Sequence, residues 1–285
     1  MVKRILVVGA GGPLGFEIAR ALLGRGHAVA ASYRTDRPGL KAAIAQAGAA
    51  TVRLDLSNPA ALRAALLSVD AAIFTPVLPT SRGAAAMLGP GQPALFFCSN
   101  GVWVDPDAPV YAALQAAETA LREAAPRVTI LRPTMIYGHP GDGNLSRLMR
   151  FMIRRRVVPR PTGVGLQQPV FYRDLARIAA DHLLDPAAAG KTISVGGPDV
   201  VTVGRLYSAV AAAARTGCLP LPLPANTARR LLPLVRRLGF DPPVTEAQLR
   251  RVHLDKRAGG PLVVTGDTPL AEGLAVLARA LEDER

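Results

Sequence analysis

Residues 7–15 read Val-Val-Gly-Ala-Gly-Gly-Pro-Leu-Gly. The apolar run at 5–8 predicts a buried strand, and apolar side chains at helical spacing follow over 16–23. Gly9 lets the chain turn, Gly12 lets a pyrophosphate approach the backbone, and Gly15 lets a helix pack on the strand. A strand, a glycine turn and a helix N-terminus in this order predict a dinucleotide site. The alternative is a turn that needs glycine torsions and binds nothing.

Strand and helix patterns alternate from residue 2 to residue 133. The expected strands are 3–8, 28–33, 50–54, 70–75, 94–98 and 127–132. The expected helices are 14–24, 38–47, 59–67, 81–88 and 109–125. This alternation predicts an α/β fold with a doubly wound parallel Rossmann sheet.

The alternation of strand and helix patterns ends after Ile136, and a smaller C-terminal substrate lobe is expected there. The division is 1–135 for the dinucleotide-binding domain and 136–285 for the lobe, with about 168–198 returning to the Rossmann body. Residues 219–224, Leu-Pro-Leu-Pro-Leu-Pro, predict an extended linker. Residues 225–240 are basic and amphipathic and are interrupted by Pro233. This segment either docks on a membrane or a partner or packs its leucines on its own protein.

The net charge of +13 comes from 30 arginines and four lysines against 21 acidic residues. Aromatic residues are only 5% of the chain, so we expect no nucleic-acid binding. No apolar run approaches the roughly 20 residues that span a bilayer. Cys98 and Cys218 have no metal-ligand spacing, so we expect no metal site and a cytoplasmic protein. A homodimer and peripheral membrane association stay open.

The end of the second expected strand indicates which dinucleotide binds. An acidic residue there favours NAD, whereas arginine makes a charge-assisted contact with the 2′-phosphate of NADP. Arg34 stands at this position with Arg37 close by, so NADP is favoured. Asp36 keeps NAD open as the alternative. Asp55, after the third strand, caps either the adenine pocket or the next helix.

These motifs resemble the extended and atypical short-chain dehydrogenase/reductases, the nucleoside-diphosphate-sugar epimerase-like group. The resemblance covers roughly residues 1–200. It rests on the glycine turn, Asp55-Leu56, Ser99-Asn-Gly-Val-Trp103, Tyr111, Leu131-Arg-Pro-Thr-Met-Ile-Tyr-Gly138, Gln168-Pro-Val-Phe-Tyr-Arg-Asp174 and Ser194-Val-Gly-Gly-Pro198. It implies hydride transfer on a small carbonyl or sugar-derived substrate, with Pro133 beside the nicotinamide. The residues expected to contact the dinucleotide are Gly9, Gly11, Gly12, Pro13, Leu14, Gly15, Arg34, Asp55, Leu56, Thr75 and Pro133.

The resemblance assigns Ser99 as the hydroxyl that polarises the substrate and Tyr111 as the acid/base. The family's lysine four residues later is replaced here by Gln115. Glutamine carries no charge with which to lower the pKa of a phenol, which is ordinarily about 10. Arg132 could supply that charge if its side chain turned inward.

Candidate substrate residues lie past the sixth expected strand: Tyr137, Asn144, Arg147 and Gln167. Gln167 stands where sugar-nucleotide epimerases often carry an arginine, and its surroundings resemble atypical members, including the accessory subunit of respiratory complex I. Two functions are therefore expected. The first is an NADP-dependent oxidoreductase or epimerase-like enzyme with a small-molecule substrate. The alternative is a non-catalytic NADP(H)-binding regulator or accessory subunit of a larger complex.

Overall fold

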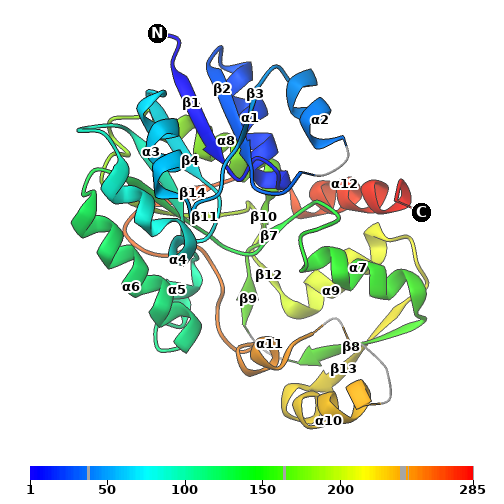
Figure 1. Ribbon diagram of the computed structural model, residues 1–285. Coiled ribbons are helices and arrows are strands. Elements are labelled where there is room, and N and C mark those ends of the chain that lie inside the picture. The colour runs from blue at the N-terminus through cyan, green and yellow to red at the C-terminus, as the bar shows by residue number, and fades with distance from the viewer. Residues whose placement is uncertain (37–38, 163–164, 238–241, 243, 285) are drawn as a thin grey trace. The chain divides into compact units, whose positions relative to one another are not determined.

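The computed structural model describes the whole chain except residues 37–38, 163–164, 238–241, 243 and 285 (Figure 1). The chain divides into two compact units. Unit 1 comprises Met1–Pro133, Arg173–Val195 and Gly259–Val264. Unit 2 comprises Thr134–Tyr172, Gly196–Ala258 and Thr265–Arg285.

The main sheet has eight strands in the order β14-β11-β6-β5-β4-β1-β2-β3. Their bounds are β1 (Arg4–Val8), β2 (Ala28–Tyr33), β3 (Ala50–Arg53), β4 (Ala71–Phe74), β5 (Ala94–Phe97), β6 (Thr129–Pro133), β11 (Thr192–Gly196) and β14 (Val263–Thr265). Neighbouring strands from β3 to β11 pair in parallel. The strand order reverses between β1 and β4, which makes this the switch point of a doubly wound sheet. The predicted α/β Rossmann fold is confirmed.

The central strands are buried on both faces. Every residue of β4 and β5 is buried, as a parallel sheet covered by helices requires. On one face, Phe74 of β4 and Phe96 of β5 stack with ring centroids 4.5 Å apart. Leu62 and Leu121, from two helices, join the same cluster. The sheet therefore forms a rigid body whose strand ends can hold loops in place.

The helices of this body are α1 (Pro13–Gly24), α2 (Leu40–Gln46), α3 (Pro59–Leu67), α4 (Leu78–Ser81), α5 (Gly101–Val104), α6 (Pro109–Ala124) and α8 (Tyr172–Leu183). Asn58 caps α3, where its Oδ1 accepts a bond from the Ala61 amide at 3.1 Å. The helix expected over 81–88 is wrong in type. The chain forms a short α-helix followed by a 3-10 segment, Arg82–Met87. Gly83 in this segment disfavours a regular α-helix.

Unit 2 packs four helices and several short strands around its own core. The helices are α7 (Leu145–Arg154), α9 (Val203–Ala213), α10 (Ala225–Arg237) and α12 (Leu270–Glu282), with the shorter α11 (Glu246–Arg250). The strands are β7 (Ile136–Tyr137), β8 (Val157–Thr162), β9 (Leu166–Gln167), β10 (Val170–Phe171), β12 (Val201–Thr202) and β13 (Leu219–Pro224). Fully buried core members include Tyr137, Met149, Val210 and Leu274.

Two sequence expectations in unit 2 are wrong. Residues 219–224 are not a linker, because they form β13 and pair in parallel with β8. The Leu219 amide donates to the Arg156 carbonyl at 2.8 Å, so the odd-numbered amides face β8. The prolines occupy the alternate positions, where an amide would point outward, and pairing survives. Pro233 does not end its helix either, since α10 continues to Arg237.

Candidate functional site

The carboxyl ends of β1 and β4 meet at the switch point of the sheet. Gly9 follows β1 with a φ of +87°, a conformation that favours glycine. A Cβ on Gly9 would overlap the hydroxyl of Thr75, which follows β4. That hydroxyl donates to the Val8 carbonyl at 2.9 Å. The Thr75 side chain therefore packs directly against the glycine turn.

The start of α1 lies close against this turn. A Cβ on Gly15 would overlap the carbonyl oxygen of Gly9 and crowd Ala10. Gly12 is the N-cap residue, and its amide donates to the Gly9 carbonyl at 3.0 Å. These contacts require glycine at 9 and 15 and bring the N-terminus of α1 onto the end of β1.

The first turn of α1 has no side-chain cap among the described residues. Pro13 has no amide hydrogen, and the first intrahelical bond is donated by Phe16 to Gly12 at 2.9 Å. The amides of Leu14 and Gly15 therefore stand at the positive end of the helix dipole. A diphosphate fits this chemistry, because it supplies the negative charge and the acceptor oxygens that these amides need.

The loop after β2 presents a cation and holds its acidic neighbour in an ion pair. Arg34 is exposed directly after Tyr33. Asp36 lies 2.7 Å from Lys41 Nζ, and Lys41 also lies over the Tyr33 ring at 5.7 Å. Hydrogen bonding to Asp36, then to Tyr33, raises the pKa of Lys41. Asp36 is thus engaged by a lysine, while Arg37 lies outside the described residues.

Asp55 follows β3 and organises its own turn. Its Oδ1 accepts from both the amide and the hydroxyl of Ser57 at 2.9 Å. These two bonds, and more weakly the charge of Arg34, lower the pKa of Asp55. Asn58 rather than Asp55 caps the next helix, so one of the two roles expected for Asp55 is wrong. Leu56 beside it is half-buried.

Ser99 and Tyr111 both lie against Gly101. The amide of Gly101 donates to Ser99 Oγ at 3.1 Å. A Cβ on Gly101 would overlap the Tyr111 ring, so the ring lies directly against the backbone here. The amide of Asn100 donates to the Pro133 carbonyl at 3.0 Å and ties this loop to the end of β6. Because Ser99 Oγ accepts from Gly101, its hydroxyl hydrogen is left to donate elsewhere.

Neither Gln115 nor Arg132 supplies a free positive charge for Tyr111. Gln115 is exposed on α6 and is neutral. Arg132 contacts Glu118 through two bonds of 3.0 Å, from Nε and from Nη2. Glu118 also accepts from the Thr192 hydroxyl at 2.9 Å. Arg132 is therefore neutralised by a buried carboxylate, and the expectation that it could serve Tyr111 is wrong.

Cys98, next to Ser99, is buried and inert. Burial, and then the neighbouring Glu118 carboxylate, raise the pKa of this thiol to about 12. It stays protonated at neutral pH, where only a thiolate is a good nucleophile. Ser99 and Tyr111 are therefore stronger candidates for reactive groups here than the Cys98 thiol.

Candidate substrate residues of unit 2 differ in their surroundings. Tyr137 is completely buried, and a Cβ on Gly273 would overlap its hydroxyl, so the structure gives it a packing role. The Arg147 guanidinium donates to the Pro242 carbonyl at 3.0 Å. Asn144 precedes α7, and the Asp142 carboxylate accepts from the backbone amide of Asn144 at 2.8 Å. Asp142 also accepts from the backbone amide of Gly138 at 3.1 Å. Asp142 therefore organises this loop, a role that its sequence position does not indicate.

The side-chain amide of Gln168 is hydrogen-bonded, whereas the Nε2 of Gln167 is not. Gln168 donates to the Gly197 carbonyl at 2.7 Å and accepts from the Ala258 amide at 2.9 Å. Gln167 is only 6% exposed, and its Nε2 has no hydrogen-bond partner among the described residues. An orphaned buried amide costs free energy, which makes Gln167 a reasonable ligand contact.

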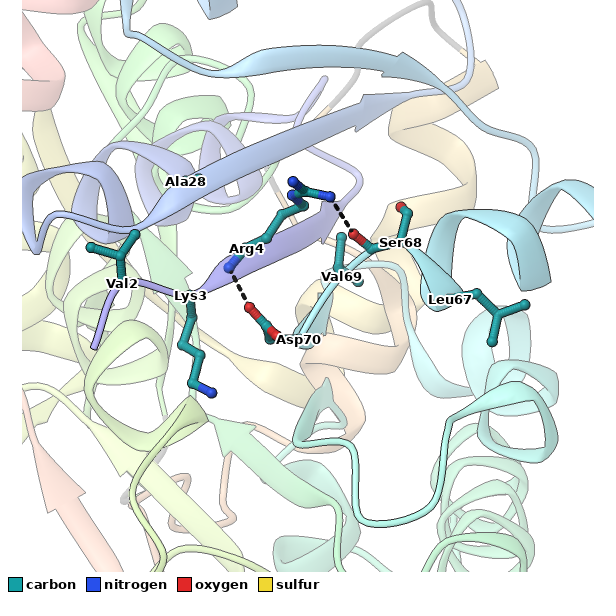
Figure 2. Close-up of a pocket in the computed structure, with 8 residues that line it drawn as sticks. All are labelled: Val2, Lys3, Arg4, Ala28, Leu67, Ser68, Val69 and Asp70. Atoms are coloured by element: carbon teal, nitrogen blue, oxygen red, sulfur yellow. Dashed lines mark hydrogen bonds between the residues drawn. The ribbon is translucent and has the colours of Figure 1, made fainter.

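A groove of about 480 Å³ lies at the amino-terminal edge of the main sheet (Figure 2). Figure 2 shows Arg4 bridging it, with the amide bonded to Asp70 at 2.7 Å and the guanidinium to the Ser68 carbonyl at 3.0 Å. These polar groups already bond to one another. Open α/β sheets bind ligands at the carboxyl ends of their strands, so this groove is not the candidate site. The described residues hold no metal-ligand cluster and no helix able to cross a membrane.

We expect Glu118→Ala to lower the free energy of unfolding by about 3–5 kcal/mol, because it leaves the Arg132 guanidinium buried without its carboxylate. Urea unfolding measures this change. Glu123→Ala, at an exposed position of the same helix, is the matched control and should change stability by less than about 0.5 kcal/mol. Equal losses in the two variants would contradict the structural role of the pair.

Residues 1–82 match the model of the NmrA-like family. NAD(P)H azoreductase of Xenophilus azovorans is 28% identical over 218 residues, which are 74% of this chain and 73% of that protein. Subunit 9 of the NADH dehydrogenase [ubiquinone] 1 alpha subcomplex, from mouse mitochondria, is 26% identical over 166 residues. Those residues are 58% of this chain but only 42% of the mouse protein.

Solved structures share the fold at lower identity. Triphenylmethane reductase of Citrobacter sp. is 20% identical with a TM-score of 0.70, covering 98% of this chain and 99% of that one. A nucleoside-diphosphate-sugar epimerase from Pseudomonas aeruginosa is 19% identical with a TM-score of 0.70, covering 99% and 98%. AtPrR2 with NADP+ and (+)pinoresinol is 20% identical with a TM-score of 0.68, covering 89% and 88%. Residues 1–82 are thus similar to the NmrA-like family, and the chain as a whole shares its fold with these solved structures.

Proposed function

We propose that the protein is an NADP(H)-dependent oxidoreductase of the short-chain dehydrogenase type that acts on a small carbonyl or sugar-derived substrate. The single observation that carries this proposal is the glycine turn with the uncapped N-terminus of α1. The N-cap residue is Gly12, and no side chain of the described residues caps this turn, so its amides stay available to a ligand. Leu14 and Gly15 would hold the diphosphate.

The preference for NADP is supported by charge at the end of β2. Arg34 is exposed there, and the carboxylate of Asp36 is paired with Lys41. A phosphate ester on the ribose would gain a charge-assisted contact with Arg34. An unphosphorylated ribose would share the Asp36 carboxylate with Lys41.

Hydride transfer is the chemistry that the nicotinamide supplies at its C4 when NADP(H) is bound. The chain's own residues manage the substrate oxygen. The Ser99 hydroxyl, which accepts from the Gly101 amide, donates its hydrogen to that oxygen. The Tyr111 hydroxyl, held against Gly101, gives or takes the proton.

A second function is favoured by the states of Gln115 and Arg132. Gln115 is neutral, and Arg132 is bonded to Glu118. Neither residue supplies the charge that the family's lysine provides to its tyrosine. The alternative is therefore a non-catalytic NADP(H)-binding regulator or an accessory subunit, and the 26% identity to a subunit of NADH dehydrogenase supports it.

Gly15→Ala should weaken NADPH binding by at least about tenfold, because the added Cβ pushes α1 away from the Gly9 carbonyl. Calorimetry measures the Kd, and energy transfer from Trp103, the chain's only tryptophan, offers a second readout. Gly24→Ala is the matched control at the other end of α1. Its Cβ meets open space, so binding should stay unchanged. Failure of the parent protein to bind either NADPH or NADH would sink the proposal.

Arg34→Ala should raise the Kd for NADPH about 10- to 100-fold, the usual worth of a hydrogen bond to a charged group. The Kd for NADH should change less than about twofold. Arg63→Ala, at an exposed position of α3, is the control for lost positive charge. An equal effect of Arg34→Ala on both nucleotides would reject the 2′-phosphate contact.

Tyr111→Phe should lower kcat by about 100-fold or more in a reductase assay with NADPH and a carbonyl panel, because the proton donor is removed. Gln115→Lys should raise kcat, since an ammonium there lowers the pKa of the phenol. Ala116→Lys adds the same charge at a neighbouring exposed position and should have no effect. If neither the parent nor Gln115→Lys turns over while NADPH still binds, the non-catalytic function is favoured.

A further inference from the structure

The positive charge of the chain is concentrated in two segments of unit 2. Residues 143–172 and 200–240 contain twelve arginines and neither an acidic residue nor a lysine. The net charge of the whole chain is +13, so these segments account for nearly all of it. They form α7, β8, α9, β13 and α10. Outside them, acidic and basic residues almost balance.

Part of this charge lies beside exposed aliphatic side chains. We call the surface of α10, β8, β13 and the turn at 154–156 the basic corner. α10 follows β13 directly and contacts both strands (Figure 1). Among the side chains that the structure describes, the basic corner has six exposed arginines: Arg154, Arg155, Arg156, Arg229, Arg230 and Arg237.

The exposed arc of α10 combines arginines with leucines. At about 100° per residue, Arg229, Arg230 and Arg237 fall within an arc of about 100°. Leu234 and Leu231, which are 55% and 42% exposed, continue that arc on one side. Leu232 points the opposite way and is buried. The helix therefore has its own packing face and a separate, solvated face that is both cationic and apolar.

The strand pair beside α10 has a similar face. Val157 of β8 pairs with Leu219 of β13, and parallel partners share a face of the sheet. Leu221 lies two residues further along the same face. These three side chains are 47%, 58% and 45% exposed. Arg154–Arg156 immediately precede Val157 in sequence.

We propose that the basic corner docks the protein on an anionic lipid bilayer. Arginine makes paired hydrogen bonds with lipid phosphates, and aliphatic side chains enter the boundary between headgroups and acyl chains. A nucleic acid would use the arginines but not the leucines, and it would favour exposed aromatic side chains for stacking. The exposed apolar residues named on this corner are all aliphatic. The lipid surface accounts for both kinds of side chain.

The test is flotation of the full chain with vesicles of phosphatidylcholine, with or without about one-third phosphatidylserine. At about 0.1 M salt, where the Debye length is about 10 Å, we expect binding only to the anionic vesicles. Arg229→Gln/Arg230→Gln and Leu231→Ser/Leu234→Ser should each lower the bound fraction about tenfold. Arg63→Gln/Arg127→Gln and Leu67→Ser, at exposed positions of unit 1, are the matched controls and should bind like the parent. Circular dichroism checks that every variant folds.

Four outcomes would overturn the proposal. The first is no flotation of the folded parent with anionic vesicles. The second is binding that survives the leucine substitutions, which indicates charge attraction alone. The third is loss of vesicle binding to a competing oligonucleotide, which would assign the surface to nucleic acid. The fourth is self-association that Leu231→Ser/Leu234→Ser abolishes, which would assign it to a second copy of the chain.

Discussion

The approach of α1 to the end of β1 is the constraint on which the nucleotide-binding half of the molecule depends. Gly15 lies so close to the carbonyl of Gly9 that no side chain fits between them. This contact aims the helix axis at the switch point of the sheet. Among the described residues no side chain caps the first turn, so its amides are available to an anion from outside the polypeptide. The two glycines that set the packing of α1 thus also shape the proposed diphosphate site.

The strand ends distribute different chemistry along one edge of the sheet. A cation follows β2, a hydrogen-bonded carboxylate follows β3, and two hydroxyl groups gather around Gly101 after β5. Behind them, Glu118 gathers Arg132 and Thr192 into a buried polar cluster. Such a cluster fixes α6 against β6 and β11, because each member would be costly to bury alone. Because Arg132 is paired with Glu118 in this cluster, its positive charge is not available to other groups.

Local patterns were sufficient to predict most of the Rossmann half. Apolar runs ending in glycine or polar residues located β1 to β6 to within one or two residues, most clearly for β4 and β5, which are buried over their whole length. The pairing of Arg132 with Glu118 could not be predicted, since it depends on how α6 lies against β6. Likewise, nothing in the sequence distinguishes Gln167 from Gln168, although one is orphaned and the other bonded twice. The Leu-Pro repeat predicts a linker because proline usually opposes strand pairing. Only the pairing register shows that each proline lies where no backbone amide is needed to bond β8.

The alternation of leucine and proline in β13 has a further consequence for how this protein behaves at high concentration. A short strand with exposed aliphatic side chains is ordinarily a template on which another chain can add by backbone pairing. The outer edge of β13 presents proline nitrogens, which carry no hydrogen, so an added strand would find carbonyl acceptors but no amide donors. The strand can therefore expose its aliphatic side chains to water without adding further strands in a cross-β aggregate.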